Sequence, residues 1–179
     1  GKPKYTDIIF KELVDVKEDG SFRLNMKYFN FATGLTMTNE KFSKLFGQKA
    51  RDPNKELLTQ FHMDVASSIQ EVIEKIVLKM VKNIKEETKV KNLCLAGGVA
   101  LNCVSNGKIL KNKIFENIWI QPASGDAGGS LGAAMAFWHQ ELSKPRYINK
   151  SKDNMNGSYL GPQFNEKIIE KSLNELKAK

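Results

Sequence analysis

Residues 93–102 read LCLAGGVALN, and residues 118–129 read IWIQPASGDAGG. Each stretch runs from a short apolar segment into a glycine turn and then into a helical pattern. A turn of this kind brings backbone N–H groups close to a phosphate, because glycine permits a close approach and a helix N-terminus favours negative charge. One such turn carries little weight, but two in series predict a cleft that grips a nucleotide from more than one side.

The segments around these turns alternate between strand and helix patterns. We predict strands at Asn92–Ala96 and Asn117–Ile120, and helices at Cys103–Lys111 and Gly128–Glu141. Strands that alternate with helices form parallel sheets covered by helices. The fold class is therefore predicted to be α/β.

The N-terminal third of the chain has the pattern of a hairpin followed by a short helix. Ile8–Val16 and Ser21–Phe29 are predicted as strands, joined by a turn at Lys17–Gly20. Thr38 is predicted to cap a helix that ends before Gly47.

A long amphipathic helix is the clearest single element of the sequence. Asp52-Pro53 predicts its start, since an aspartate cap followed by proline suits the first turn of a helix. Its apolar residues recur at spacings of three and four, which predicts a stripe that packs on a sheet. They are Phe61, Val65, Ile69, Val72, Ile73, Ile76, Val77 and Met80. Further on, Ser143–Ser158 has the composition of a linker, and Asn165–Lys179 is predicted as a terminal helix.

Composition limits the classes of function. The chain has 179 residues, of which 41% are hydrophobic and 27% charged, and a net charge of +8. Its lysines are spread along predicted helices and mixed with glutamate, which favours solvated helix faces over a nucleic-acid interface. No apolar run approaches the ~20 residues that a membrane helix needs. Cys94 and Cys103 form no Cys-x-x-Cys motif, so a reducing cytoplasm is expected.

Two positions carry both a chemical and a structural interpretation. Gly97-Gly98 and Asn102 could contact a nucleotide, or they could form a tight turn with Asn102 as the helix cap. Asp126 could cap the next helix, or it could hold a cation beside a phosphate, since carboxylates are normal ligands of such cations. His62 and His139 form no metal-binding pair and are expected to be structural.

The motifs GGVALNCVSNG at 97–107 and PASGDAGG at 122–129 together resemble the O-carbamoyltransferases of the nodulation-factor and antibiotic type. The opening GKPKY at 1–5 and YLGP at 159–162 are also similar to that family. The resemblance implies the second lobe of an actin-like, sugar-kinase-like ATPase domain of the ribonuclease H-like kind. Such a lobe has a mixed sheet, an N-terminal hairpin and helices on both faces. We expect it to occupy residues 1–142, with 143–179 as the linker and terminal helix that lead to a further domain.

The resemblance also implies an activity. Enzymes of this family move a carbamoyl group from carbamoyl phosphate, through carbamoyl-adenylate made with ATP, to a hydroxyl of a small-molecule or sugar acceptor, and they use iron or a similar divalent metal. By the motif match, Gly97, Gly98, Val99, Asn102 and Gly125 are expected to bind the nucleotide. Asp126 is expected to be a metal ligand, and no catalytic base is identified.

The sequence departs from the family pattern because it lacks the His-x3-His pair that supplies two metal ligands. The first lobe and the adenylate-forming domain are expected before Gly1 and after Lys179. We therefore expect the isolated chain to hold little or no metal and to be inactive. Two alternatives stay open: a tRNA threonylcarbamoyl-transferring enzyme of the same superfamily, and a nonenzymatic nucleotide-binding module. Neither a membrane nor a nucleic acid is the expected partner.

Overall fold

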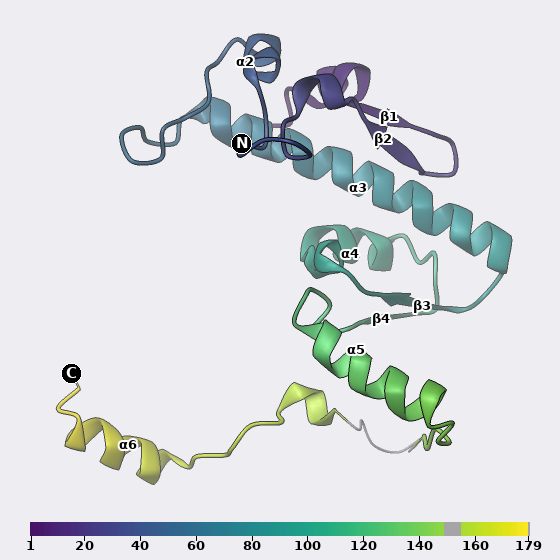
Figure 1. Cartoon of the computed structure of the whole chain (residues 1–179), viewed down its shortest axis with the longest axis vertical. Coiled ribbons are helices and arrows are strands. Elements are labelled where there is room, and N and C mark those ends of the chain that lie inside the picture. Colours follow the sequence, from purple (N-terminus) through teal and green to yellow (C-terminus); the bar gives the residue numbers. More distant parts are fainter. Residues whose placement is uncertain (149–154, 179) are drawn as a thin grey trace. The chain divides into compact units, whose positions relative to one another are not determined.

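The computed structural model describes residues 1–148 and 155–178. It divides into two compact units, Gly1–Asp126 and Ala127–Lys179 (Figure 1). The first unit holds all four described strands and the long helix α3. None of the described helices is long and apolar enough to cross a membrane.

The long helix α3 spans Gln60–Thr88 and carries the predicted apolar stripe, so this prediction is confirmed. The predicted start at Asp52-Pro53 is wrong, because Thr59 is the N-cap and forms a capping box with His62. Asp52 instead closes a separate turn, in which its side chain accepts a hydrogen bond from the Asn54 N–H at 3.0 Å. An aspartate can cap an isolated turn as readily as a helix, which explains the error.

The N-terminal segment forms α1 at Thr6–Ile8, a π-helical turn at Ile9–Leu13 and strand β1 at Val14–Val16. Strand β2, Phe22–Leu24, pairs antiparallel with β1, which confirms the hairpin. The predicted strands were too long. Residues 8–13 are helical because Ile9 and Leu13, four apart, both become buried against α3. Met26–Tyr28 is a 3-10 turn rather than strand.

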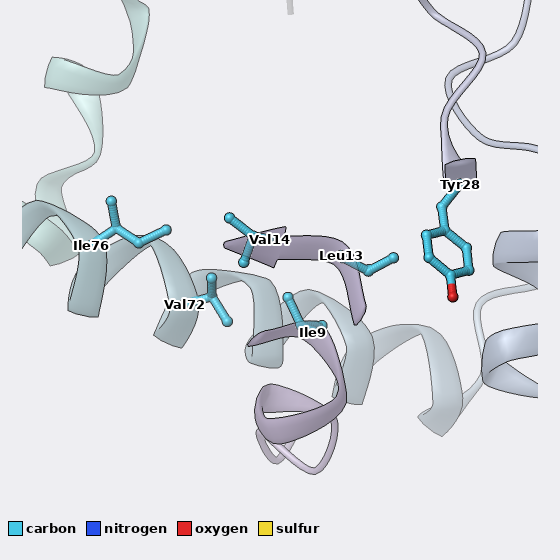
Figure 2. Close-up of a cluster of buried hydrophobic side chains, with 6 residues drawn as sticks. All are labelled: Ile9, Leu13, Val14, Tyr28, Val72 and Ile76. Atoms are coloured by element: carbon cyan, nitrogen blue, oxygen red, sulfur yellow. The ribbon is translucent and has the colours of Figure 1, made fainter. Parts of the chain in front are cut away.

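The first buried cluster lies where this segment meets α3. Figure 2 shows its side chains, which come from α3 and from the first 28 residues: Ile9, Leu13, Val14, Tyr28, Val72 and Ile76. Helix α2, Glu40–Phe46, packs its aromatic side chains beside this cluster. Its N-cap is Asn39 rather than the predicted Thr38, and Gly47 ends it with a φ of 67°, as predicted.

A strand–helix–strand unit follows α3. Strand β3 spans Asn92–Leu95, α4 Cys103–Lys111 and β4 Asn117–Ile120, and the two strands pair in parallel. These predictions are confirmed. The second buried cluster joins this unit to the far end of α3 and consists of Val81, Leu93, Ile109 and Phe115. The described strands thus form two separate pairs, β1–β2 and β3–β4, where we expected one mixed sheet.

The second unit is helical among its described residues. Helix α5 covers Gly128–Ala136 and continues as a π-helical turn over Phe137–Glu141, which confirms the predicted helix. A 3-10 turn lies at Asn156–Ser158, and α6 spans Glu166–Glu175 after the cap Asn165. Residues 149–154 of the predicted linker and Lys179 of the predicted terminal helix lie outside the described residues. The division of the chain at residue 142 stays a prediction.

Candidate functional site

The two glycine turns meet at one edge of the β3–β4 pair. Because the strands are parallel and in register, both turns leave the pair at its carboxyl end. The Gly97 N–H donates a hydrogen bond of 2.7 Å to the Ser124 carbonyl, which ties the first turn directly to the second. The carboxyl ends of parallel strands are where α/β proteins bind their ligands.

Open space surrounds the glycines of these turns. Gly97 has a φ of 100°, a conformation that side chains with a Cβ rarely adopt. Gly98 and Gly125 have ordinary backbone angles, and a Cβ built on either of them meets no atom within 4 Å. Packing within this unit therefore gives no reason for glycine at these two positions, whereas the close approach of a ligand would give one.

The hydroxyl of Ser124 adds a second mark of a binding site. This side chain is buried, and its Oγ has no hydrogen-bond partner among the described residues. An unpaired buried hydroxyl costs about 1–3 kcal/mol, so a partner from a ligand would be favourable. The open glycine backbone and the unpaired hydroxyl make the two turns the candidate binding site of this chain.

Asn102 caps α4, as the structural interpretation predicted. Its Oδ1 accepts hydrogen bonds from the Ser105 N–H at 3.1 Å and from Gln70 Nε2 at 3.1 Å, and its Nδ2 donates to Gln70 Oε1 at 3.0 Å. A carboxamide has two N–H donors, so one is left that no described residue accepts. The cap is thus confirmed, and a contact from Asn102 to a nucleotide stays a prediction.

Asp126 lies at the exposed end of the second turn. The cap of α5 falls on Ala127 and involves no side chain, so the interpretation of Asp126 as a cap is wrong. Among residues 1–148 and 155–178, no group of three or more His, Cys, Asp or Glu side chains is placed to hold a metal ion. A single carboxylate does not fit a metal by itself. A metal here would need ligands from outside the described residues.

The comparisons with known proteins bear on these turns. A family model described as carbamoyltransferase N-terminus matches residues 1–135, which include both glycine turns and most of α5. The chain belongs to the carbamoyltransferase family.

Three bacterial relatives show how much of a longer protein this chain represents. An uncharacterized protein of Synechocystis sp. is 58% identical over 173 residues, which is 97% of this chain and 28% of the relative. Nodulation protein NolO of Bradyrhizobium diazoefficiens is 43% identical over 117 residues, 65% of this chain and 20% of that protein. Nodulation protein NolNO of Sinorhizobium fredii is 40% identical over 116 residues, 64% of this chain and 16% of that protein. The chain thus spans less than a third of each of these relatives.

Sequence reasoning missed the polar residues of α3 and α4 that support Asn102 next to the first turn. Gln70 of α3 binds Asn102 and donates a second hydrogen bond of 2.9 Å to Glu74 Oε1, and Glu74 forms an ion pair with Lys108 of α4. Burial of Glu74 raises the pKa of its carboxyl, but hydrogen bonds from Lys108 and Gln70 outweigh that and hold the pKa below its usual range. The available sign was Glu74 itself, which stands between the stripe residues Ile73 and Ile76 and is buried beside Lys108.

The two histidines have structural roles, as expected. His62 Nδ1 lies 3.0 Å from the Thr59 nitrogen in the capping box of α3. His139 Nδ1 lies 2.9 Å from the Lys144 carbonyl oxygen.

Proposed function

We propose that this chain is the part of an ATP-dependent O-carbamoyltransferase that binds the nucleotide half of the carbamoyl donor. Membership of the carbamoyltransferase family supports carbamoyl transfer in general. The proposal of nucleotide binding rests on the hydrogen bond from the Gly97 N–H to the Ser124 carbonyl. This bond joins two open glycine turns at the carboxyl end of a parallel strand pair.

The residues of the two turns have distinct roles in this proposal. The backbone of Gly97, Gly98 and Val99 lies along one side of the nucleotide, and Gly125 lies along the other. The free N–H of Asn102 donates to the same ligand, with Gln70 holding the carboxamide in place. Ser124 offers the hydroxyl that lacks a partner among the described residues.

Carbamoyl-adenylate, formed from ATP and carbamoyl phosphate, supplies an activated carbamoyl carbon with AMP as its leaving group. The oxygen of a hydroxyl on a small molecule or sugar attacks that carbon, and the bond from the carbon to the phosphate oxygen breaks. The proton of the hydroxyl must pass to a base that lies outside the residues assigned here. The turns of this chain bind and orient the donor during that exchange.

We also propose that Asp126 supplies one ligand of a divalent metal, iron or similar. Its remaining ligands, the first lobe and the adenylate-forming domain would come from the additional polypeptide that the longer relatives possess. On this proposal the isolated chain is inactive, and the complete protein works in the cytoplasm.

The test uses a full-length protein. The Synechocystis relative would carry this chain in place of its 173 aligned residues. Transfer of the labelled carbamoyl group from radiolabelled carbamoyl phosphate to a panel of sugars and other hydroxyl compounds would be measured with and without ATP. ATP-dependent transfer is the expected result. Absence of transfer to the panel, together with tight, salt-sensitive binding of tRNA, would instead favour the threonylcarbamoyl branch.

Matched glycine variants test the assigned turn in the same protein. Gly98→Ala and Gly107→Ala both place a methyl group in open space, but only Gly98 lies in the turn. We expect Gly98→Ala to weaken ATP binding at least about tenfold, or about 1.4 kcal/mol, without unfolding the protein, and Gly107→Ala to leave binding unchanged. Equal affinities in the two variants would remove the first turn from the nucleotide site.

A further inference from the structure

An apolar groove follows α3 between the two strand pairs. It has a volume of about 520 Å³. Its floor comes from the stripe of α3 between Ile69 and Ile84, one wall from the β1–β2 hairpin and the other from β3 and the first glycine turn. None of the side chains that line it is charged, and Ser105 and Asn106 are its polar members.

One wall of this groove is an open sheet edge. In the β3–β4 pair, the Lys91 and Leu95 carbonyls accept hydrogen bonds from backbone N–H groups at the two ends of β4. The backbone groups of the alternate residues Asn92 and Cys94 therefore point away from β4, and β4 is the one described strand that pairs with β3. Cys94 is exposed and lines the groove.

Exposure to water is unfavourable both for the apolar groove and for the open edge of β3. Parallel strands are normally buried on both faces, and a sheet of two strands needs further strands or a packed helix for stability. An exposed apolar surface next to an unpaired edge is a site where another strand binds. Because no charged side chain lines the groove, its occupant has to be an apolar segment that brings its own backbone hydrogen-bonding groups.

We infer that an apolar β-strand from the additional polypeptide of the full-length protein lies in this groove and pairs with the open edge of β3. The source of the strand follows from the comparisons, since the Synechocystis relative aligns with 97% of this chain yet is more than three times as long. The strand joins the β1–β2 and β3–β4 pairs into one sheet on α3. Its place in the groove does not depend on which reaction the enzyme catalyses.

The first test measures the accessibility of Cys94. The full-length protein, made as the Synechocystis relative carrying this chain, is treated with N-ethylmaleimide, and labelling of Cys94 is followed by peptide mass spectrometry before and after unfolding in guanidinium. Cys103, at the exposed start of α4, is the internal reference. We expect native Cys94 to react at least about a hundredfold more slowly than in the unfolded protein.

Two results would overturn the inference. Labelling of native Cys94 as fast as in the unfolded protein would show that the edge is uncovered. Protection that is present in the 179-residue chain alone and disappears on dilution, with dimers detected by sedimentation, would show that a second copy covers the groove instead.

A pair of charge substitutions on α3 gives an independent measurement. Ile69 and Met63 have similar exposed fractions, 37% and 44%, but only Ile69 lines the groove. In the full-length protein we expect Ile69→Glu to lower the Tm by roughly 5 °C or more, because it buries a charge under the added strand, and Met63→Glu to lower it by less than about 1 °C. Equal changes in Tm for the two variants would contradict a strand in the groove.

Discussion

The two ends of α3 hold their neighbours by different means. Near its start, a chain segment crosses the helix and is held by polar contacts: Asp64 accepts from the Lys2 N–H at 2.7 Å, and Ser68 accepts from the Tyr5 N–H at 2.9 Å. Near its end, apolar side chains dominate, with Ile109 of α4 fully buried beside Val81.

One helix can thus be covered both by an irregular segment and by a regular helix, each held by a different kind of contact. Asp64, Ser68 and Glu71 are spaced by four and three residues, so they form a polar stripe on one face of α3. An irregular segment that crosses a helix brings unpaired backbone N–H groups. Asp64 and Ser68 accept hydrogen bonds from two of them, and Glu71 accepts one from the Thr6 hydroxyl at 2.8 Å. A regular helix such as α4 satisfies most of its own backbone, so apolar contact, the ion pair between Lys108 and Glu74 and the Gln70–Asn102 pair at its cap are enough.

The largest expected effects come from the centres of the two clusters. Ile109→Ala and Ile9→Ala each remove a fully buried side chain, and each should lower the free energy of unfolding by about 3–4 kcal/mol. Urea unfolding followed by circular dichroism measures both. If the clusters belong to one cooperative unit, both variants shift the same single transition. Two separate transitions would show that the ends of α3 unfold independently.

The ion pair between Lys108 of α4 and Glu74 of α3 should contribute less. Lys108→Met leaves the buried Glu74 carboxylate without its cation, which should lower the free energy of unfolding by about 2 kcal/mol. Adding Glu74→Gln should recover part of that loss, because the charge is removed. Lys111→Met, on the exposed side of α4, is the control and should change stability by less than about 0.5 kcal/mol. A double variant as unstable as Lys108→Met would contradict this account.

The polar stripe near the start of α3 should make thermal stability depend on pH. Hydrogen bonds from the Lys4 side chain, the Lys2 N–H and Gln60 hold the pKa of Asp64 well below its ordinary value of 3.8. A lowered pKa contributes stability above the ordinary value, and that contribution is lost as the pH falls from 3.8 toward the native pKa. Asp64→Asn should therefore lower the Tm at neutral pH.

The same variant should differ less from the original protein at a pH well below 3.8, where the Asp64 contribution has declined. Thermal unfolding at the two pH values measures this, and Asp7→Asn, at an exposed position in α1, is the control. A difference in Tm that is independent of pH would mean that the charge of Asp64 does not hold the N-terminal segment.

The smallest expected effects are those of two glycine substitutions, one in α4 and one in the β1–β2 hairpin, which should change stability in opposite directions. Gly107 lies inside α4 with open space around it, so Gly107→Ala should raise the free energy of unfolding by about 0.5–1 kcal/mol. Gly20→Ala should lower it, because Gly20 has a φ of 87° and its added Cβ would clash with Met80 of α3. Thermal unfolding of both variants checks the signs, and stabilisation by Gly20→Ala would show that the hairpin is not seated against α3.

The predictions from sequence succeeded where the determining signals are local. The bounds of α4 and β4 were predicted to the residue, because Asn102 caps the helix and a short turn links it to the next strand. The same reasoning failed at Ile8–Leu13, where a run of apolar residues suits a strand equally well. Contact with α3 decided for a helical turn, which puts Ile9 and Leu13 on one face.

The family, the α/β class and the long helix could be predicted without a structure, since these follow from motifs and from periodicity within single segments. Which residues meet depends on how the segments pack. The Gly97–Ser124 bond, the Gln70–Asn102 pair at a separation of 32 residues and the Lys2–Asp64 bond at 62 all join segments whose patterns are independent of each other. A polar residue in a sequence shows that it needs a partner, and the packing of the elements determines which one it finds.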